Sequence, residues 1–270
     1  MALVPFPQKS LTTDQDPDWD ESDEPLAEGK MSFLEHLDEL RKRIIWSVAG
    51  VGIGFVAACF YIKQIYAFVM DPMQKLLKPG EHLVYTEPSE YFALYIKLAV
   101  IAGLLLASPW VMWQVWRFIA PGLYKNEKRF AIPFVLLSTV SFVAGAAFSH
   151  YVVFPMSWKF FGSFSDDTTV FMPRIAPSFS MYLKLLIAFA LVFQMPAVVL
   201  FLARMGLITA RFLLKNFKYA VLLIFIAAAV LTPDASPVTQ TAMAAPMIGL
   251  YLISIALAWL FGKKRRTVED

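Results

Sequence analysis

The chain has 270 residues and a net charge of +3; hydrophobic residues make up 58% of it and charged residues only 17%. Soluble domains carry roughly 25% charged residues, so this composition excludes an ordinary soluble domain and favours a polytopic membrane protein. The single cysteine, Cys59, lies in an apolar run, which excludes a disulfide framework within the chain and predicts a packing role.

The amino-terminal stretch, residues 1–30, differs from everything that follows it. Between Asp14 and Glu28 it is acidic and contains prolines. It has neither the apolar core of a secretory signal nor the arginines of a transit peptide. We therefore expect a disordered acidic cytoplasmic tail, with Met31 as an equally good start of translation.

Six apolar segments follow, which predicts an all-α, polytopic membrane domain with six transmembrane helices over residues 31–262, then a basic cytoplasmic tail over 263–270. The segments span about 44–62, 91–119, 131–154, 179–203, 219–231 and 241–261. A transmembrane helix needs about 20 residues. The fifth segment has 13, or about 20 Å of helix, so it has to thin the bilayer, borrow flanking residues or shelter against its neighbours.

Lysines and arginines set the predicted orientation, because they gather in the cytoplasmic loops of membrane proteins. With a cytoplasmic amino terminus, seventeen of them fall on the inner side and five on the outer side. The inner set is Lys9, Lys30, Arg41, Lys42, Arg43, Arg117, Lys125, Lys128, Arg129, Arg204, Arg211, Lys215, Lys218, Lys263, Lys264, Arg265 and Arg266. The outer set is Lys63, Lys75, Lys78, Lys159 and Arg174. Both termini are therefore predicted to be cytoplasmic.

The loop over residues 120–130 is a basic hinge between two long apolar segments. Pro121 and Gly122 stop a helix there, and a single carboxylate, Glu127, is kept among the surrounding cations. This carboxylate is a candidate docking point for a positively charged partner.

Two aromatic features mark predicted membrane interfaces. Residues 65–70 form an amphipathic stretch that we expect to rest at the outer interface. Trp110, Trp113 and Trp116 recur at helical spacing toward the inner end of the second segment. We interpret them as interfacial anchors, with stacking against a substrate as the alternative.

Few polar side chains lie within the segments. We expect Lys97 and Lys184 to extend toward the outer interface, with an ion pair of Lys97 to Glu87 or Glu90 as the alternative. Gln194, near the middle of the fourth segment, is expected to form a hydrogen bond either inside the chain or to a partner helix.

Enzyme motifs are absent from the sequence: there is no HExxH, GxSxG, glycine-rich phosphate loop or Cys/His metal spacing. The three histidines are far apart, and His150 is expected at the outer interface. We therefore predict that the protein is not an enzyme and has no cofactor or metal. A secondary transporter or ion-coupled carrier is the alternative function, although matching interrupted helices and midplane acidic residues are missing.

Several stretches resemble the TatC family of twin-arginine translocases. Residues 33–43 (FLEHLDELRKR) are similar to the family's amino-terminal signature, and residues 115–124 with Glu127 resemble its first cytoplasmic loop. Phe154-Pro155, Gln194-Met195-Pro196 and Thr232-Pro233-Asp234 fit later landmarks in the right order. The resemblance covers about residues 31–262.

This resemblance implies a receptor that binds signal peptides carrying paired arginines and organises the export of folded proteins. It would be a multi-pass protein of the bacterial cytoplasmic (inner) membrane, in a system driven by the proton-motive force. The implied partners are single-span TatA and TatB proteins, twin-arginine signal peptides, the lipid bilayer and further copies of the chain as a homo-oligomer in a larger complex. Nucleic acid is not among them.

By position, the resemblance also implies a set of signal-peptide-binding residues. They are Glu39, Leu40, Arg41, Phe118, Pro121 and Glu127. Gln194 stands where many members have Glu, so a role that needs a titratable group does not transfer, and Asp234 is displaced from the family's usual double-proline loop.

Carboxylates suit this role because the planar guanidinium group of arginine binds them through two parallel hydrogen bonds. Glu39 and Glu127 are predicted on the same face of the membrane. The alternative is that each pairs with its own neighbours, Glu39 with Arg43 and Glu127 with Lys125 or Arg129.

Overall fold

The computed structural model describes residues 33–77, 83–84, 87–119, 131–163, 172–232 and 236–262. In these ranges the chain is helical apart from short connections and one isolated bridge, between Val84 and Arg174. Five helical stretches are long and apolar enough to cross a membrane: Leu34–Phe60, Pro88–Leu106, Ile132–Gly162, Ile175–Arg204 and Pro237–Phe261. The apolar helix Phe217–Leu231 is shorter, as predicted for the fifth segment. The all-α, polytopic class is thus confirmed.

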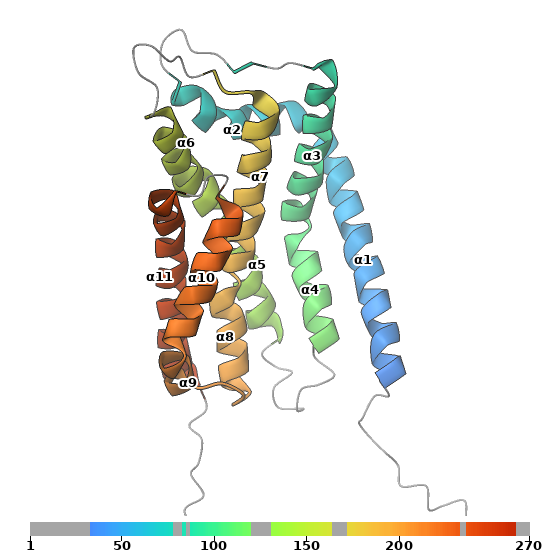
Figure 1. Ribbon diagram of the computed structural model, residues 1–270. Coiled ribbons are helices and arrows are strands. Elements are labelled where there is room, and N and C mark those ends of the chain that lie inside the picture. Colours follow the sequence, from blue (N-terminus) through green and yellow to red (C-terminus); the bar gives the residue numbers. More distant parts are fainter. Residues whose placement is uncertain are drawn as a thin grey trace, which may run out of the picture.

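The helices follow the predicted order (Figure 1). Their bounds are α1 (Phe33–Phe60), α2 (Ile62–Lys75), α3 (Pro88–Leu106), α4 (Ser108–Ile119), α5 (Ala131–Phe148), a π-helical turn (Ser149–Val153), α6 (Phe154–Gly162), α7 (Ile175–Val192), α8 (Met195–Arg204), α9 (Ala210–Lys215), α10 (Phe217–Leu231) and α11 (Pro237–Phe261).

The first helix begins earlier than its apolar segment. The segment was predicted from about residue 44, whereas α1 begins at Phe33 and includes the charged stretch before it. Residues 33–43 contain neither proline nor glycine and are rich in strong helix formers, so nothing in them opposes a helix. The charged motif is therefore a rigid extension of the first span.

Prolines divide three of the spans. Pro109, Pro155 and Pro196 each occupy the second position of α4, α6 and α8. Proline has no backbone N–H and its ring clashes with the carbonyl four residues earlier, so the helix before it has to end or widen. The chain bends at Ala107 and at Gln194, and it widens into the π-helical turn before Pro155.

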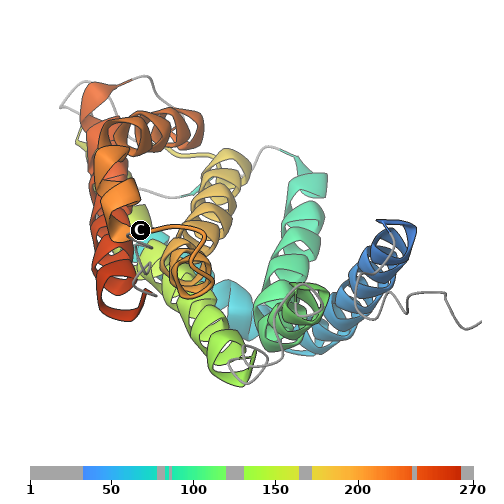
Figure 2. The same cartoon turned by 90° about the horizontal axis from the view of Figure 1, so that it is seen from below.

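The spans stand side by side in a curved wall, with α1 at one edge and α10 and α11 at the other (Figure 2). The central helix α7 supplies much of the core through Phe179, Tyr182, Leu185 and Phe189, which are buried. Phe142 of α5 and Phe154 of α6 are in the same core.

The amphipathic helix α2 lies across one end of the wall (Figure 1). It includes the predicted stretch 65–70 and buries Val69, Met70 and Met73. The hydroxyls of Tyr66 on α2 and Tyr91 on α3 lie 2.9 Å apart. Burial, reinforced by this hydrogen bond, holds the pKa of Tyr66 above its usual value, so the Tyr66 phenol stays a neutral hydrogen-bonding group.

Close backbone contact joins α1 to α3. A Cβ atom added at Gly54 would lie 2.4 Å from the carbonyl oxygen of Gly103, and one at Gly103 would lie 2.5 Å from the nitrogen of Phe55. Further along, the Trp110 indole nitrogen donates to the Trp46 carbonyl oxygen over 2.9 Å. Small residues thus let α1 approach the wall, as in other membrane helix pairs.

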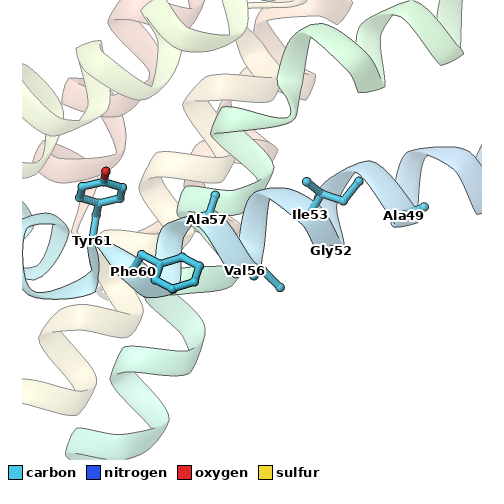
Figure 3. A pocket seen from close by; sticks show the side chains of 7 residues that line it. All are labelled: Ala49, Gly52, Ile53, Val56, Ala57, Phe60 and Tyr61. Atoms are coloured by element: carbon cyan, nitrogen blue, oxygen red, sulfur yellow. The ribbon is translucent and has the colours of Figure 1, made fainter.

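The other side of α1 is open. A shallow apolar groove runs along it, lined by Ala49, Gly52, Ile53, Val56, Ala57, Phe60 and Tyr61 (Figure 3). Cys59 is also exposed, so the predicted packing role for this residue inside the chain is wrong. The sequence pattern did not show which faces of an apolar helix meet protein and which meet lipid.

Two other predictions are corrected. Trp116 is only 3% exposed and packs against Phe134 and Phe201, so it belongs to the core and is not an interfacial anchor. His150 is 5% exposed, stacks on Phe68 and lies 3.0 Å from the Tyr182 hydroxyl, so it is not an interfacial residue either. Both side chains sit where a neighbouring helix covers them.

The α1–α3 contact predicts a difference between two glycine substitutions. Gly54→Ala places a methyl group against the Gly103 backbone and should lower the free energy of unfolding by about 1–3 kcal/mol. Gly52→Ala is the matched control, because its Cβ meets nothing within 4 Å. Thermal melts of the two variants in detergent, followed by circular dichroism, measure this difference. Equal melting temperatures would contradict the close contact.

Candidate functional site

The start of α1 and the end of α4 meet at one end of the wall, opposite α2 (Figure 1). The rings of His36 and Phe118 stack there, with centroids 4.4 Å apart and an interplanar angle of 16°. The structure therefore brings the amino-terminal motif beside Phe118, although 82 positions separate the two rings in sequence. Pro121 and Glu127, predicted for the same site, lie outside the described residues.

Glu39 is the acidic group of this junction. Its Oε1 accepts a hydrogen bond from Arg43 Nη2 over 2.8 Å, which is the local pairing considered as the alternative from the sequence. Its Oε2 is buried and has no hydrogen-bond partner among the residues that the structure describes, and the same holds for Arg43 Nε. A buried carboxylate oxygen without a donor is costly, so the site favours an incoming N–H group.

The helical repeat sorts the remaining residues of the motif. His36, Glu39, Leu40 and Arg43 recur at intervals of three and four and share one face of α1. All four are half-buried, whereas Arg41 is exposed. The structure thus gathers Glu39, Leu40 and Phe118 from the predicted set and places Arg41 on a different face of the helix.

Sequence reasoning missed two members of this cluster. Arg43 was considered only as a competitor for Glu39, and His36 only as an isolated histidine. The spacing of four residues between Glu39 and Arg43 signals an ion pair on a helix. No sequence signal indicated that His36 meets Phe118, because that contact depends on how α1 packs against α4.

A second buried polar side chain, Gln114, lies on α4, four residues before Phe118. Gln114 is only 2% exposed and its Oε1 is buried without a hydrogen-bond partner. An amide at this level of burial is normally satisfied by protein or water. Gln114 is therefore a second place on the helix before the 120–130 loop where a polar ligand or a water molecule would be stabilised.

Gln194 lies at the bend between α7 and α8. Its Nε2 donates a hydrogen bond to the carbonyl oxygen of Ser138 on α5, over 2.9 Å. The internal alternative is thus present in the structure. A primary amide has a second N–H and an acceptor oxygen, and the side chain is only half-buried, so capacity for another bond remains.

Metal chemistry finds no support in the described ranges, which contain no group of three or more His, Cys, Asp or Glu side chains able to hold an ion. The junction of α1 and α4 instead offers one carboxylate, one guanidinium and two aromatic rings. That combination suits recognition of a cationic peptide segment.

The hydrogen bond from Gln194 to Ser138 predicts how much the Gln194 side chain contributes to the stability of the fold. Gln194→Ala should lower the free energy of unfolding by about 1 kcal/mol, because the Ser138 carbonyl oxygen loses its donor. Gln194→Met keeps the size without the amide and should lose a similar amount. Melting temperatures in detergent measure both effects. An unchanged stability in both variants would show that this hydrogen bond contributes nothing to the fold.

Comparison with known proteins identifies the family of the chain. The family described as Sec-independent protein translocase protein (TatC) matches residues 35–246. The Sec-independent protein translocase protein TatC of Desulforapulum autotrophicum is 41% identical over 243 residues, covering 90% of each chain. That of Koribacter versatilis is 42% identical over 241 residues, covering 87% of this chain and 88% of its own length.

Solved structures agree as well. One crystal structure of the twin-arginine translocase receptor TatC has a TM-score of 0.73 at 36% identity and covers 83% of this chain and 98% of that one. A second, in the detergent DDM, has a TM-score of 0.75 at 34% identity and covers 85% and 100%. This family is a transport component and not an enzyme. The chain belongs to the TatC family of Sec-independent protein translocases, the receptor subunits of the twin-arginine pathway.

Proposed function

We propose that this receptor binds the paired arginines of a signal peptide at the junction of α1 and α4. The observation that carries the proposal is the Glu39 carboxylate, which has one oxygen on Arg43 and the other buried without a donor in the described part of the chain. It lies one turn from His36, which stacks on Phe118. A guanidinium group supplies N–H donors in a planar fork and satisfies such an oxygen better than the point charge of a lysine.

The second arginine of the signal needs a second carboxylate. Glu127 is the acidic residue of the loop that follows Phe118, and we assign it this role. Phe118 lies under the peptide and stacks on one guanidinium plane, while Leu40 contacts the adjacent apolar residue of the signal. Pro121, in the loop that follows α4, is assigned to the same site. Arg41, exposed on another face of α1, contacts the peptide only beyond the arginine pair.

The orientation of the chain follows from its charges. The ends of α1, α4 and α8 that carry lysines or arginines lie together at the site end, as does the end of α11, which the basic residues 263–266 follow in sequence (Figure 1). The positive-inside rule puts this end in the cytoplasm. We therefore propose a multi-pass protein of the bacterial cytoplasmic (inner) membrane with both termini in the cytoplasm, where signal peptides arrive before export.

Partner helices complete the proposal. TatA- and TatB-type single-span proteins and further copies of this chain would meet its membrane surface, and the proton-motive force would drive transport. The free hydrogen-bonding capacity of Gln194 supports a polar contact with one such helix. The open groove of α1 supports a second, apolar contact (Figure 3). The ion-coupled carrier considered from the sequence is not retained, because the family transports proteins.

Substitutions of the two carboxylates test the recognition site. Glu39→Gln and Glu127→Gln should each weaken binding of a twin-arginine signal peptide roughly ten- to a hundredfold, the effect of losing one partly desolvated, charge-assisted pair. A signal changed to Lys-Lys should lose much less. Binding of fluorescent peptides to the full chain in nanodiscs measures four affinities for each carboxylate: those of the wild type and of the variant for the Arg-Arg and for the Lys-Lys signal.

The matched control is Asp38→Asn, which removes an exposed carboxylate next to Glu39 on the same helix and should leave the affinity near that of the wild type. Glu127→Lys should be worse than Glu127→Gln, because repulsion adds to the lost bonds. Equal losses for Arg-Arg and Lys-Lys signals would remove the substituted carboxylate from the arginine site.

The orientation has its own test. In a Cys59→Ser background, a cysteine placed at Asn126 should react with an impermeant maleimide in inverted membrane vesicles and not in intact cells. A cysteine at Asp71 of α2 should show the reverse pattern. Labelling of the Asn126 position from outside would rule out the cytoplasmic site.

A further inference from the structure

Two lysines inside the spans have no role in the proposed recognition site. Lys97 on α3 and Lys184 on α7 are exposed, and neither forms a hydrogen bond or ion pair with any residue that the structure describes. The ion pair of Lys97 considered from the sequence is not formed, because Glu90 pairs with Arg174 over 3.0 Å. Two cations without protein partners at membrane depth need an explanation.

The two lysines lie at the same depth. Lys97 follows Pro88, the first residue of α3, by nine positions, and Lys184 follows Ile175, the first residue of α7, by nine positions. The helix starts are tied together, because Arg174, directly before α7, pairs with Glu90 in the first turn of α3 over 3.0 Å. Each lysine therefore lies about 14 Å of helix below a common level.

On each helix, two small residues precede the lysine on the same face. The two sets are Ser89, Ala93 and Lys97 on α3, and Ala176, Ser180 and Lys184 on α7, each at intervals of four. A hollow of about 230 Å³ lies between the two helices, lined by Ser89, Glu90, Ala93, Leu94 and Lys97 of α3 and by Ala176, Phe179 and Ser180 of α7. The Glu90 carboxylate in this lining is paired with Arg174 over 3.0 Å, so its charge is compensated. Lys97 lines this hollow itself. Lys184 does not line it, but it follows Ser180 by four residues on the same face of α7 and leans toward the hollow, because side chains on a helix lean toward its amino terminus.

We propose that the hollow between α3 and α7 binds the phosphate headgroup of one anionic phospholipid from the leaflet at the α2 end. The lysines supply the charge, the small residues supply the space, and Phe179 contributes an apolar wall beside which the lipid glycerol fits. The volume far exceeds the roughly 30 Å³ of one water molecule. Two lysines that only extend to the bulk lipid headgroups would need no hollow. A variant that fills the hollow and keeps both lysines therefore distinguishes the two explanations.

The experiment uses the purified full chain in detergent, with native mass spectrometry to compare bound phosphatidylglycerol and phosphatidylcholine of identical acyl chains. A lysine near a membrane surface strengthens anionic-lipid binding by about fivefold. Lys97→Gln and Lys184→Gln should each lower the preference for phosphatidylglycerol about fivefold, and the double variant should abolish it. Lys97→Arg should retain it.

Two further variants separate a shaped site from general attraction. Ser180→Leu keeps both lysines but fills the hollow, and it should also remove most of the preference. Lys159→Gln, an exposed lysine on α6, is the charge-matched control and should leave it unchanged. Melting temperatures equal to that of the wild type show that each variant is folded.

Three results would overturn the proposal. A double lysine variant that keeps the preference removes the lysines from lipid binding, and a Ser180→Leu variant that keeps it removes the hollow. The wild-type chain could also show no lipid preference but bind an acidic single-span helix. If the double lysine variant loses that binding, the lysines belong to a site for a protein partner. Displacement of the lipid by millimolar inorganic phosphate would assign the hollow to a free anion.

Discussion

The structure depends on one constraint: inside a membrane, backbone N–H and C=O groups have to find partners within the protein. Helices satisfy this requirement everywhere except where proline removes a donor. Polar side chains lie next to each of the three proline interruptions. Ser108, next to Pro109, donates to the Leu105 carbonyl oxygen, and Ser157, two residues after Pro155, donates to the Val153 carbonyl oxygen. Gln194, two residues before Pro196, donates to the carbonyl oxygen of Ser138 on α5. At the first interruption, the Ser108 hydroxyl thus gives the Leu105 carbonyl oxygen the donor that Pro109 lacks.

The recognition site in turn depends on how closely α1 approaches the wall. The Gly54–Gly103 contact and the Trp110–Trp46 hydrogen bond fix α1 along α3 and α4. Because these helices are rigid, the contact near the middle of the membrane determines that His36 and Phe118 meet at the end. Glu39 lies on the same face of α1 as His36, where Arg43 binds one of its oxygens and the other has no donor among the described residues, which is the basis of the proposed recognition site.

Hydropathy predicted the order and approximate bounds of the five long apolar stretches and the shortness of the helix Phe217–Leu231, because long apolar runs have few alternatives to membrane helices. It did not predict the start of α1, since charged residues extend a helix without raising its hydropathy. The motif resemblance indicated Glu39 and Phe118 but not His36. Errors at Cys59, Trp116 and His150 share a cause: burial depends on which helices become neighbours, and a sequence that is apolar on every side does not record this. Pro121 and Glu127 remain sequence predictions.

The π-helical turn changes the direction in which the side chains after it point. Twelve residues separate Phe142 on α5 from Phe154 on α6, and in an unbroken α-helix, at about 100° per residue, their side chains would point roughly 120° apart. The wider π-helical turn advances by a smaller angle per residue and recovers much of that difference. Both phenylalanines are accordingly buried in one core. A single irregular turn therefore lets one span present a continuous apolar stripe across a proline, which a regular helix of the same sequence would split between two faces.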